Sequence, residues 1–299
     1  MRQFLFLLAM SLLSAFPIAA RNSALLIGIG HYDTLATGWA KIHGNNDVTL
    51  LQHKLEKQGF EVATLTDSAA TKAEVMDALH QLVSRTLAGD QVYLHFSGHG
   101  QLIEDVNGDE ELDQSFVCYN ACFSTDFNCG RHPYKGQHHL IDDELFPLLD
   151  ALKQKVGKKG QVMLIFDTCY SRGADRGDGS DDEDEGGSDV EWLETTRGTS
   201  DEFLLSTSAR KYFQGIEAPG TYSSAGGRLT VISACESDKR NYECRDRYSG
   251  KCYGSLSFCL AKLLDRKLPM SHWGKFFQQK KYMPYRIFRP SQHPVVEFH

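Results

Sequence analysis

A short apolar run that stops at a polar, reactive sequence constrains this chain more than any other feature. Residues 162–166 read Val-Met-Leu-Ile-Phe, and Asp167, Thr168 and Cys169 follow directly. An apolar run without polar alternation, bounded by Gly160 and by a later glycine-rich stretch, predicts a strand buried on both faces of a parallel sheet. Such a strand places Cys169 at the carboxyl edge of the sheet, where open α/β folds bind their ligands. A buried core cysteine is the alternative interpretation.

A second apolar run, within residues 91–100, ends in a histidine between two glycines, Gly98 and Gly100. Glycines on both sides allow a sharp turn and leave the His99 imidazole uncrowded. If the two strands are neighbours, about 4.8 Å apart, His99 and Cys169 face each other across one sheet edge. Because a thiolate is the nucleophile and a nearby imidazole lowers its pKa or accepts its proton, the pair predicts nucleophilic catalysis.

The first part of the chain alternates between strand and helix patterns. Strand-like runs at 23–30 and 60–65 are each followed by a helical pattern, over about 46–58 and 71–87. This alternation is typical of an α/β sandwich, in which helices flank a central, mostly parallel sheet.

Two hexapeptides connect these patterns to a known family. His-Phe-Ser-Gly-His-Gly at 95–100 and Phe-Asp-Thr-Cys-Tyr-Ser at 166–171 resemble the active-site motifs of the caspase-like cysteine peptidases of clan CD, closest to the metacaspase branch. The resemblance runs from about Ser23 to the C-terminus and is weakest over 172–203 and near 122–139. The Gln-Ala-Cys-Arg-Gly signature of true caspases is absent.

The resemblance implies a caspase-like fold and a cysteine endopeptidase. Peptide bonds would be hydrolysed through an acyl-enzyme on Cys169, with His99 moving the proton to the leaving amine. The backbone amides of Gly98 and Cys169 would be the oxyanion donors. Two alternatives belong to other classes: a catalytically silent caspase-like interaction module, and an exported calcium-binding protein whose cysteine is structural.

Substrate specificity is predicted from two acidic residues, one in the second motif and one in the segment 43–48, which resembles a pocket segment of metacaspases. Asp167 lies two residues before Cys169, and Asp47 and Ser97 match the other pocket positions of metacaspases, although Gly44 stands where that family usually has cysteine. Two carboxylates in one pocket favour arginine or lysine before the scissile bond. For Asp47, a helix cap is the alternative role.

Calcium is implied by the resemblance as an activator, whereas no cofactor is expected for the chemistry itself. Asp113, Asp142 and Asp143 match the calcium-site carboxylates of metacaspases, and Asp175 matches a fourth after a shift of one residue. Hard oxygen ligands of this kind suit Ca²⁺. The acidic stretch before Asp113 can also be a solvated turn between short strands.

The chain is expected to hold one caspase-like domain behind a signal peptide. Residues 1–20 are apolar and end in small residues, which predicts export to the periplasm or the medium. Residues 21–171 resemble the large subunit of the family and 204–299 the small subunit. Between them, residues 172–203 are rich in Asp, Glu and Gly, and are predicted to be a disordered acidic loop.

Self-processing is expected in that loop, so that a single-chain zymogen would mature by its own activity. Arg172, Arg176 and Arg197 are basic residues of the type that the pocket should accept. The bond between Arg197 and Gly198 is the first choice, because the acidic run of 178–191 should repel an acidic pocket. An uncut insert is the alternative.

Charge and cysteine content bound the partners. A formal net charge of −7 argues against non-specific nucleic-acid binding, and the N-terminal apolar stretch is short for a stable membrane span. The expected partner is a peptide or protein with a basic residue before the cut, and the chain itself is expected to be a monomer.

Export permits disulfides among the eight cysteines. The plausible pairs are Cys122 with Cys129 and Cys244 with Cys252, whereas Cys235 and Cys259 are predicted core residues.

Overall fold

The centre of the protein is a six-stranded sheet with the order β12-β9-β7-β3-β1-β2. A computed structural model describes residues 20–127, 134–169, 189–205, 210–217, 220–236, 239–279, 287–289 and 291–299. The central strands are β1 (Asn22–Gly28), β2 (Phe60–Thr66), β3 (Gln91–Ser97), β7 (Gln161–Asp167), β9 (Arg228–Ser233) and β12 (Val295–Phe298). Neighbouring strands are parallel except β12, which runs antiparallel to β9. The predicted α/β class, with a mostly parallel central sheet, is confirmed.

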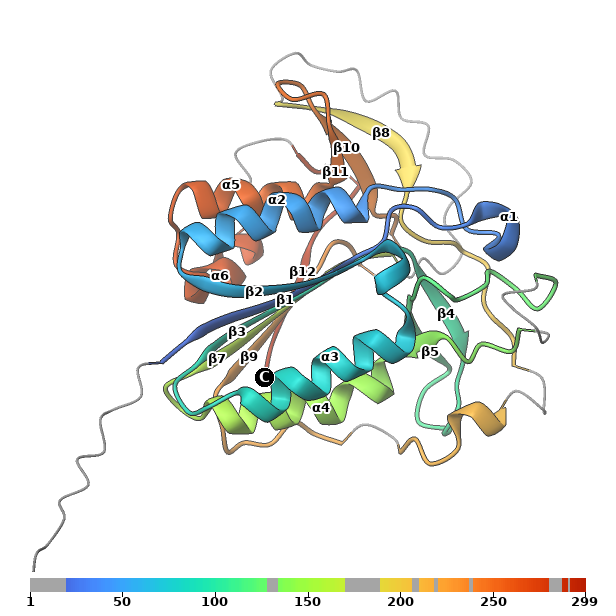
Figure 1. Ribbon diagram of the computed structural model, residues 1–299, viewed down its shortest axis with the longest axis horizontal. Helices are drawn as coiled ribbons and strands as arrows, with labels where there is room; N and C mark the ends of the chain where they lie inside the picture. The colour runs from blue at the N-terminus through green and yellow to red at the C-terminus, as the bar shows by residue number, and fades with distance from the viewer. Residues whose placement is uncertain are drawn as a thin grey trace, which may run out of the picture.

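Helices cover both faces of this sheet (Figure 1). One layer contains α2 (Gly44–Lys57), α5 (Ser255–Asp265) and α6 (Trp273–Gln278), and the opposite layer contains α3 (Lys72–Arg85) and α4 (Asp142–Val156). Each layer packs on its own cluster of buried apolar side chains, and the inner strands contribute alternate residues to the two clusters. Because both faces of β1, β3 and β7 are covered, their sequences are continuous apolar runs.

The register between β3 and β7 brings the two sequence motifs together. The strands are parallel neighbours, and Ser97 pairs with Asp167 at their carboxyl ends. His99 and Cys169 each follow two residues later, so both emerge from the same edge of the sheet. The expectation that the two strands are neighbours is confirmed.

Two small antiparallel sheets lie beside this edge (Figure 1). The first has the order β4-β5-β6 and the second the order β11-β10-β8. Their strands are β4 (Gly100–Glu104), β5 (Leu112–Val117), β6 (His139–Ile141), β8 (Val190–Thr196), β10 (Tyr242–Asp246) and β11 (Cys252–Gly254). The short helix α1 (Thr34–Thr37) lies in the loop after β1.

The prediction of disorder over 172–203 is wrong for the residues described in this stretch, which begin at Asp189. Val190–Thr196 forms β8 and pairs antiparallel with β10. Val190 is buried, and the Trp192 indole N–H donates to the Ile287 carbonyl oxygen at 3.1 Å. The polar composition is compatible with a strand here because β10 satisfies its backbone groups. Residues 172–188 lie outside the described ranges.

Cysteine pairing differs from the prediction at one of two places. Cys244 and Cys252 are free, because β10 and β11 pair Cys244 with Tyr253 and Arg245 with Cys252. This register puts the two cysteines one residue apart, so that their side chains point to opposite faces. Cys122 is disulfide-bonded, and its expected partner Cys129 is not among the described residues. Cys235 and Cys259 are buried, as predicted for core residues.

The predicted signal peptide lies outside the described ranges except for Ala20. Within those ranges, every helix is too short or too polar to cross a membrane.

Candidate active site

His99 is held by aromatic side chains, and a hydrogen bond to a backbone carbonyl defines its tautomer. The ring stacks on Trp39 with centroids 4.8 Å apart, and Tyr32 lies 5.1 Å away on a tilted plane. Its Nε2 faces the Ala40 carbonyl oxygen at 2.9 Å and must therefore carry the proton, since a carbonyl only accepts. Burial lowers the pKa of His99 to about 4, so the ring is neutral near pH 7. Nδ1 is then a free lone pair, and it has no hydrogen-bond partner in the described part of the chain.

Cys169 follows β7 with Thr168 between them, and the residue is only 1% exposed. The thiol donates to the Lys239 carbonyl oxygen at 3.2 Å, and the thiol of Cys235 donates to the same oxygen at 3.3 Å. The backbone amide of Cys169 donates at 3.0 Å to the carbonyl oxygen of Arg197. The candidate nucleophile is thus next to a peptide carbonyl of its own chain.

Two amides converge on that carbonyl. The Arg197 oxygen accepts from Cys169 at 3.0 Å and from Gly100 at 3.0 Å. Two backbone donors aimed at one carbonyl oxygen, one of them the amide of the candidate nucleophile, form an arrangement that can stabilise an oxyanion. The Gly98 amide, expected from the sequence to be the second donor, is directed to the Asp167 carbonyl oxygen at 3.5 Å. Sequence reasoning missed Gly100 because glycines flank His99 on both sides, and only the backbone path shows which amide faces the carbonyl.

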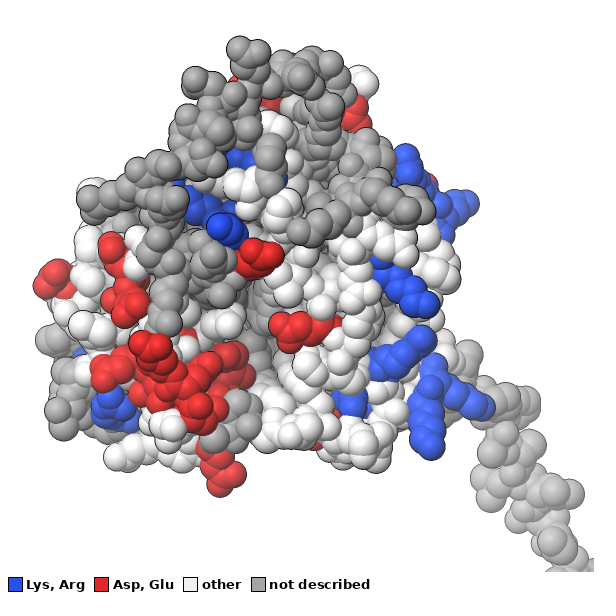
Figure 2. Space-filling view, turned by 180° about the vertical axis from the view of Figure 1, so that it is seen from behind, with Lys and Arg blue, Asp and Glu red and all other residues white. Residues whose placement is uncertain are grey.

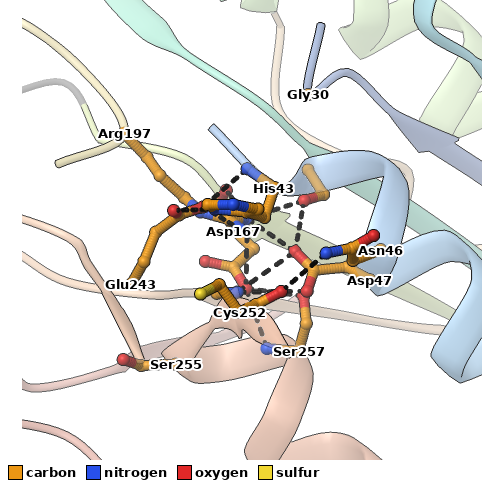
Figure 3. Close-up of polar contacts among 12 residues, drawn as sticks. Gly30, His43, Asn46, Asp47, Asp167, Arg197, Glu243, Cys252, Ser255 and Ser257 are labelled. Atoms are coloured by element: carbon orange, nitrogen blue, oxygen red, sulfur yellow. Dashed lines mark hydrogen bonds and ion pairs between the residues drawn. The ribbon is translucent and has the colours of Figure 1, made fainter. Parts of the chain in front are cut away.

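The Arg197 side chain enters an acidic pocket at the same sheet edge (Figure 3). It is fully buried, and its NH1 atom lies 2.7 Å from Asp47 Oδ2, 2.6 Å from Ser97 Oγ and 3.7 Å from Asp167 Oδ2. The Ser97 hydroxyl in turn donates to Asp47 Oδ2 at 2.7 Å. All three pocket residues predicted from the sequence therefore surround one guanidinium group.

Asp47 does not cap the helix in which it lies. Helix α2 begins at Gly44, and the Asp47 carboxylate instead accepts from the Gly254 amide at 3.0 Å, beside its contacts with Arg197 and Ser97. Its interpretation as a helix cap is wrong, because one turn inside the helix its side chain points into the pocket. Burial raises the pKa of Asp47 to about 7, against the opposing effect of the Arg197 charge.

Glu243 is a third carboxylate of the pocket, and sequence reasoning missed it. Its Oε1 accepts from Arg197 NH2 at 2.8 Å and from Arg197 Nε at 3.2 Å. His43 holds it from the other side, with its backbone amide 2.8 Å from Oε1 and its Nδ1 2.5 Å from Oε2. Glu243 lies in a polar stretch far along the chain, where no local pattern distinguishes it from a solvated surface residue.

The Arg197 guanidinium and the carboxylates around it stabilise one another's charged forms. Burial disfavours the charged form of Arg197, but Asp47, Asp167 and Glu243 outweigh this effect and raise its pKa. Burial acts to raise the pKa of Glu243. The Arg197 charge and the hydrogen bond from His43 together outweigh burial, so the pKa of Glu243 is lowered. Three carboxylates around one guanidinium leave the pocket with an excess of negative charge, which favours a cationic side chain.

The backbone around Arg197 is bound on both sides in extended form. Upstream, the Arg197 amide donates to the Asn241 carbonyl oxygen at 3.0 Å, continuing the pairing of β8 with β10. Downstream, Gly198 bridges to Gly100 in parallel, and Phe203 bridges to Ile103 on β4. A strand that adds to free edges in this way is a common mode of peptide recognition.

Two of the predicted calcium residues, Asp113 and Asp142, belong to a separate acidic cluster, and Asp143 follows Asp142 directly in the chain. Carboxylate oxygens of Glu110, Asp113 and Asp142 lie within 4.8 Å of one another, as do those of Asp105, Asp109 and Asp113. Figure 2 shows Asp and Glu side chains gathered into a patch on the face away from the viewer of Figure 1. Burial, followed by the neighbouring carboxylates, raises the pKa of Asp113 to about 8.

Two oxygens of this cluster have unmet bonding capacity. Asp113 Oδ1 and Asp143 Oδ1 are buried and have no hydrogen-bond partner among the residues that the structure describes. Crowded carboxylates with such orphaned oxygens fit a hard divalent cation. Asp175, the fourth expected ligand, lies outside the described ranges, as do Arg172 and Arg176.

Comparison with known proteins identifies a family and several relatives. The model of the family described as "Caspase domain" matches residues 21–242. Metacaspase-1B of Aspergillus fumigatus is 28% identical over 239 residues, which cover 76% of this chain and 51% of that protein. Metacaspase-1 of Eremothecium gossypii is 30% identical over 163 residues, covering 51% and 32%. The chain thus spans about half the length, or less, of these relatives.

A solved structure supports the fold. Protein GSU0716 from Geobacter sulfurreducens superimposes with a TM-score of 0.62 and 20% sequence identity, over 93% of both chains. The family match covers most of the chain, and the His99 and Cys169 motifs lie within it. The chain therefore belongs to the caspase domain family.

Proposed function

We propose that this chain is a cysteine endopeptidase that hydrolyses peptide bonds after arginine or lysine and cuts its own chain after Arg197. One observation carries the proposal. Arg197 fills an acidic pocket while its carbonyl oxygen accepts hydrogen bonds from the amides of Cys169 and Gly100. A basic side chain in a pocket, with its own carbonyl beside a thiol, is the arrangement expected of a bound substrate.

The residues support a cysteine-peptidase mechanism. His99 Nδ1 accepts the thiol proton, and the Cys169 thiolate attacks the carbonyl carbon of the residue in the pocket. Negative charge on the carbonyl oxygen is stabilised by the amides of Cys169 and Gly100. His99 then donates its proton to the leaving amine, which leaves a thioester on Cys169. Water, deprotonated by His99, hydrolyses the thioester and restores the thiol.

Preference for a basic residue follows from the charges in the pocket. Asp47, Asp167 and Glu243 are fully buried, and Arg197 is the cation beside them. An aspartate in the same place would be a fourth buried carboxylate, which is strongly unfavourable. Substrates with aspartate before the bond should therefore be rejected.

Self-cleavage is supported by the position of the bond after Arg197. Gly198 lies against Cys169: a side-chain carbon added to Gly198 would be 2.9 Å from Cys169 Cβ. The peptide bond between Arg197 and Gly198 therefore lies next to the candidate nucleophile of the same chain. Before the cut the segment occupies the substrate site, so the uncut chain would be a zymogen.

Calcium is proposed as an activator that binds the cluster of Glu110, Asp113, Asp142 and Asp143. Bound there, it would supply positive charge that neutralises crowded carboxylates and ties the turn between β4 and β5 to the start of α4. The orphaned oxygens of Asp113 and Asp143 support this assignment. We also propose, from the apolar N-terminus alone, that the chain acts after export.

A peptide library with every residue type before the scissile bond tests the function. The purified chain, incubated with calcium, should cleave after arginine and lysine and should leave peptides with aspartate intact. No cleavage by the wild-type chain, with or without calcium, would identify a silent interaction module. Calcium binding without cleavage would instead identify a calcium-binding protein.

A further inference from the structure

We infer that Glu243, held in place by His43, makes the pocket select arginine over lysine. The inference rests on the proposed cleavage after basic residues and adds a determinant of specificity within that class. It comes from the hydrogen bonds of the Arg197 guanidinium, whose nitrogens contact two separate groups of acceptors (Figure 3).

The two ends of the guanidinium have separate partners. NH1 contacts Asp47 at 2.7 Å and Ser97 at 2.6 Å, whereas NH2 and Nε donate to Glu243 at 2.8 and 3.2 Å. Only a planar fork with several donors reaches both groups at once. A lysine ammonium is a single nitrogen, so it can occupy the position of NH1 or that of NH2, but not both.

Glu243 cannot adjust to a shorter cation. It is fully buried, and His43 fixes both of its oxygens, with the backbone amide 2.8 Å from Oε1 and Nδ1 2.5 Å from Oε2. If lysine binds near Asp47 and Ser97, Glu243 loses the two donors of the guanidinium while remaining buried. An incompletely paired buried carboxylate is costly, so lysine is penalised relative to arginine.

His43 acts on specificity through Glu243 and is a positioning residue. It precedes α2, whereas Glu243 lies on β10, so their contact joins segments that are 200 positions apart in the chain. A purely structural role for this contact would change the activity on all substrates by the same factor. A role in specificity changes the ratio between arginine and lysine substrates.

The experiment compares two fluorogenic peptides that differ only by arginine or lysine before the scissile bond. We expect the wild-type kcat/KM for the arginine peptide to exceed that for the lysine peptide by at least about tenfold. In Glu243→Gln, which keeps the side-chain shape, the ratio of the arginine value to the lysine value should fall by about tenfold or more. A change in self-processing alters both values by the same factor and leaves this ratio unchanged.

Asp47→Asn is the matched control. Asp47 contacts NH1, the position that a lysine ammonium would also take, so both values should fall together and their ratio should persist. His43→Gln should reduce the ratio in the same direction as Glu243→Gln. The lysine peptide serves within each variant as the test that the protein is folded and active.

The outcomes separate this inference from the proposed function. Cleavage of both peptides with a wild-type ratio near one overturns the inference alone, as does an unchanged ratio in Glu243→Gln. Failure of the wild-type chain to cleave either peptide overturns the proposed function, and the inference with it.

Discussion

The carbonyl oxygen of Arg197 lies 3.0 Å from the backbone nitrogen of Cys169, the residue on which the catalytic proposal centres. The Arg197 amide is bound on the upstream side by Asn241, and Gly198 pairs with Gly100 on the downstream side. The chain around Arg197 is therefore held as an extended peptide, with the bond between Arg197 and Gly198 next to Cys169.

Replacing the nucleophile should remove activity and leave the fold intact. Cys169→Ala deletes the sulfur that would form the thioester, so peptide cleavage should fall by at least about 10³-fold. Circular dichroism and the thermal midpoint should stay close to those of the wild type. Cys252→Ser, at a partly exposed cysteine of β11, is the matched control and should keep its activity. Near wild-type turnover by Cys169→Ala would refute the mechanism.

Removing the basic side chain at the expected cut should prevent that cut. Wild-type protein incubated with calcium should yield a fragment whose N-terminal residue is Gly198, identified by sequencing. In Arg197→Gln this fragment should be missing, because the pocket requires a cation. Arg210→Gln, which removes a partly exposed arginine paired with Glu104, should be processed normally. A Gly198 terminus in the Arg197→Gln protein would contradict the proposal.

The residue after the cut is also constrained. A carbon added to Gly198 would lie 2.2 Å from the Cys169 carbonyl oxygen, so Gly198→Ala must shift the bond away from the thiol. Because small displacements are costly in catalysis, self-cleavage should slow by about tenfold or more, as measured by gel densitometry over time. The neighbouring Ser200→Ala should cleave at the wild-type rate. Equal rates for both variants would show that the bond is not cut in this position.

Calcium should stabilise the fold through the acidic cluster, independently of catalysis. In the Cys169→Ala background, calcium at about 100 times its dissociation constant should add about 2.7 kcal/mol to the free energy of unfolding. Asp113→Asn should abolish the associated rise in thermal midpoint, since it removes a carboxylate with an orphaned oxygen. Asp77→Asn, at an exposed carboxylate of α3, is the control. An undiminished rise in Asp113→Asn would place calcium elsewhere.

The contact between His43 and Glu243 predicts how stability depends on pH. The hydrogen bond that His43 donates to the Glu243 carboxylate raises the pKa of His43 above 6.5. A group whose pKa is higher in the folded state than in the unfolded state stabilises the fold when it is protonated. For His43 this contribution is complete below about pH 6.5 and is lost as the pH rises through the pKa of the folded state.

His43→Gln should therefore lower the thermal midpoint relative to the wild type at pH 5.5, and the difference should shrink towards pH 9. The difference at pH 5.5 should be about 1–3 °C, since solvent screens the half-exposed imidazole. His53→Gln, on an exposed position of the same helix, is the control. A difference that grows with pH would have the wrong sign for this contact.

The sequence alone was sufficient for the central strands and for the residues that leave their ends. β3 and β7 are continuous apolar runs because both of their faces are covered, and such runs are visible without a structure. Their order and length then placed His99 and Cys169 at one sheet edge. Ser97 and Asp167 could be predicted because each lies in one of the two motifs, and Asp47 because the segment 43–48 resembles a pocket segment of metacaspases.

Tertiary structure decided everything that depends on segments meeting across the fold. Glu243 joins the pocket only because β10 lies beside the start of α2, and β8 is ordered only because β10 satisfies its backbone groups. Gly100 rather than Gly98 faces the Arg197 carbonyl because of the backbone path around His99. A local sequence pattern reports the burial of its own residues, whereas the pairing of a buried charge is set by residues that the folded chain brings to it.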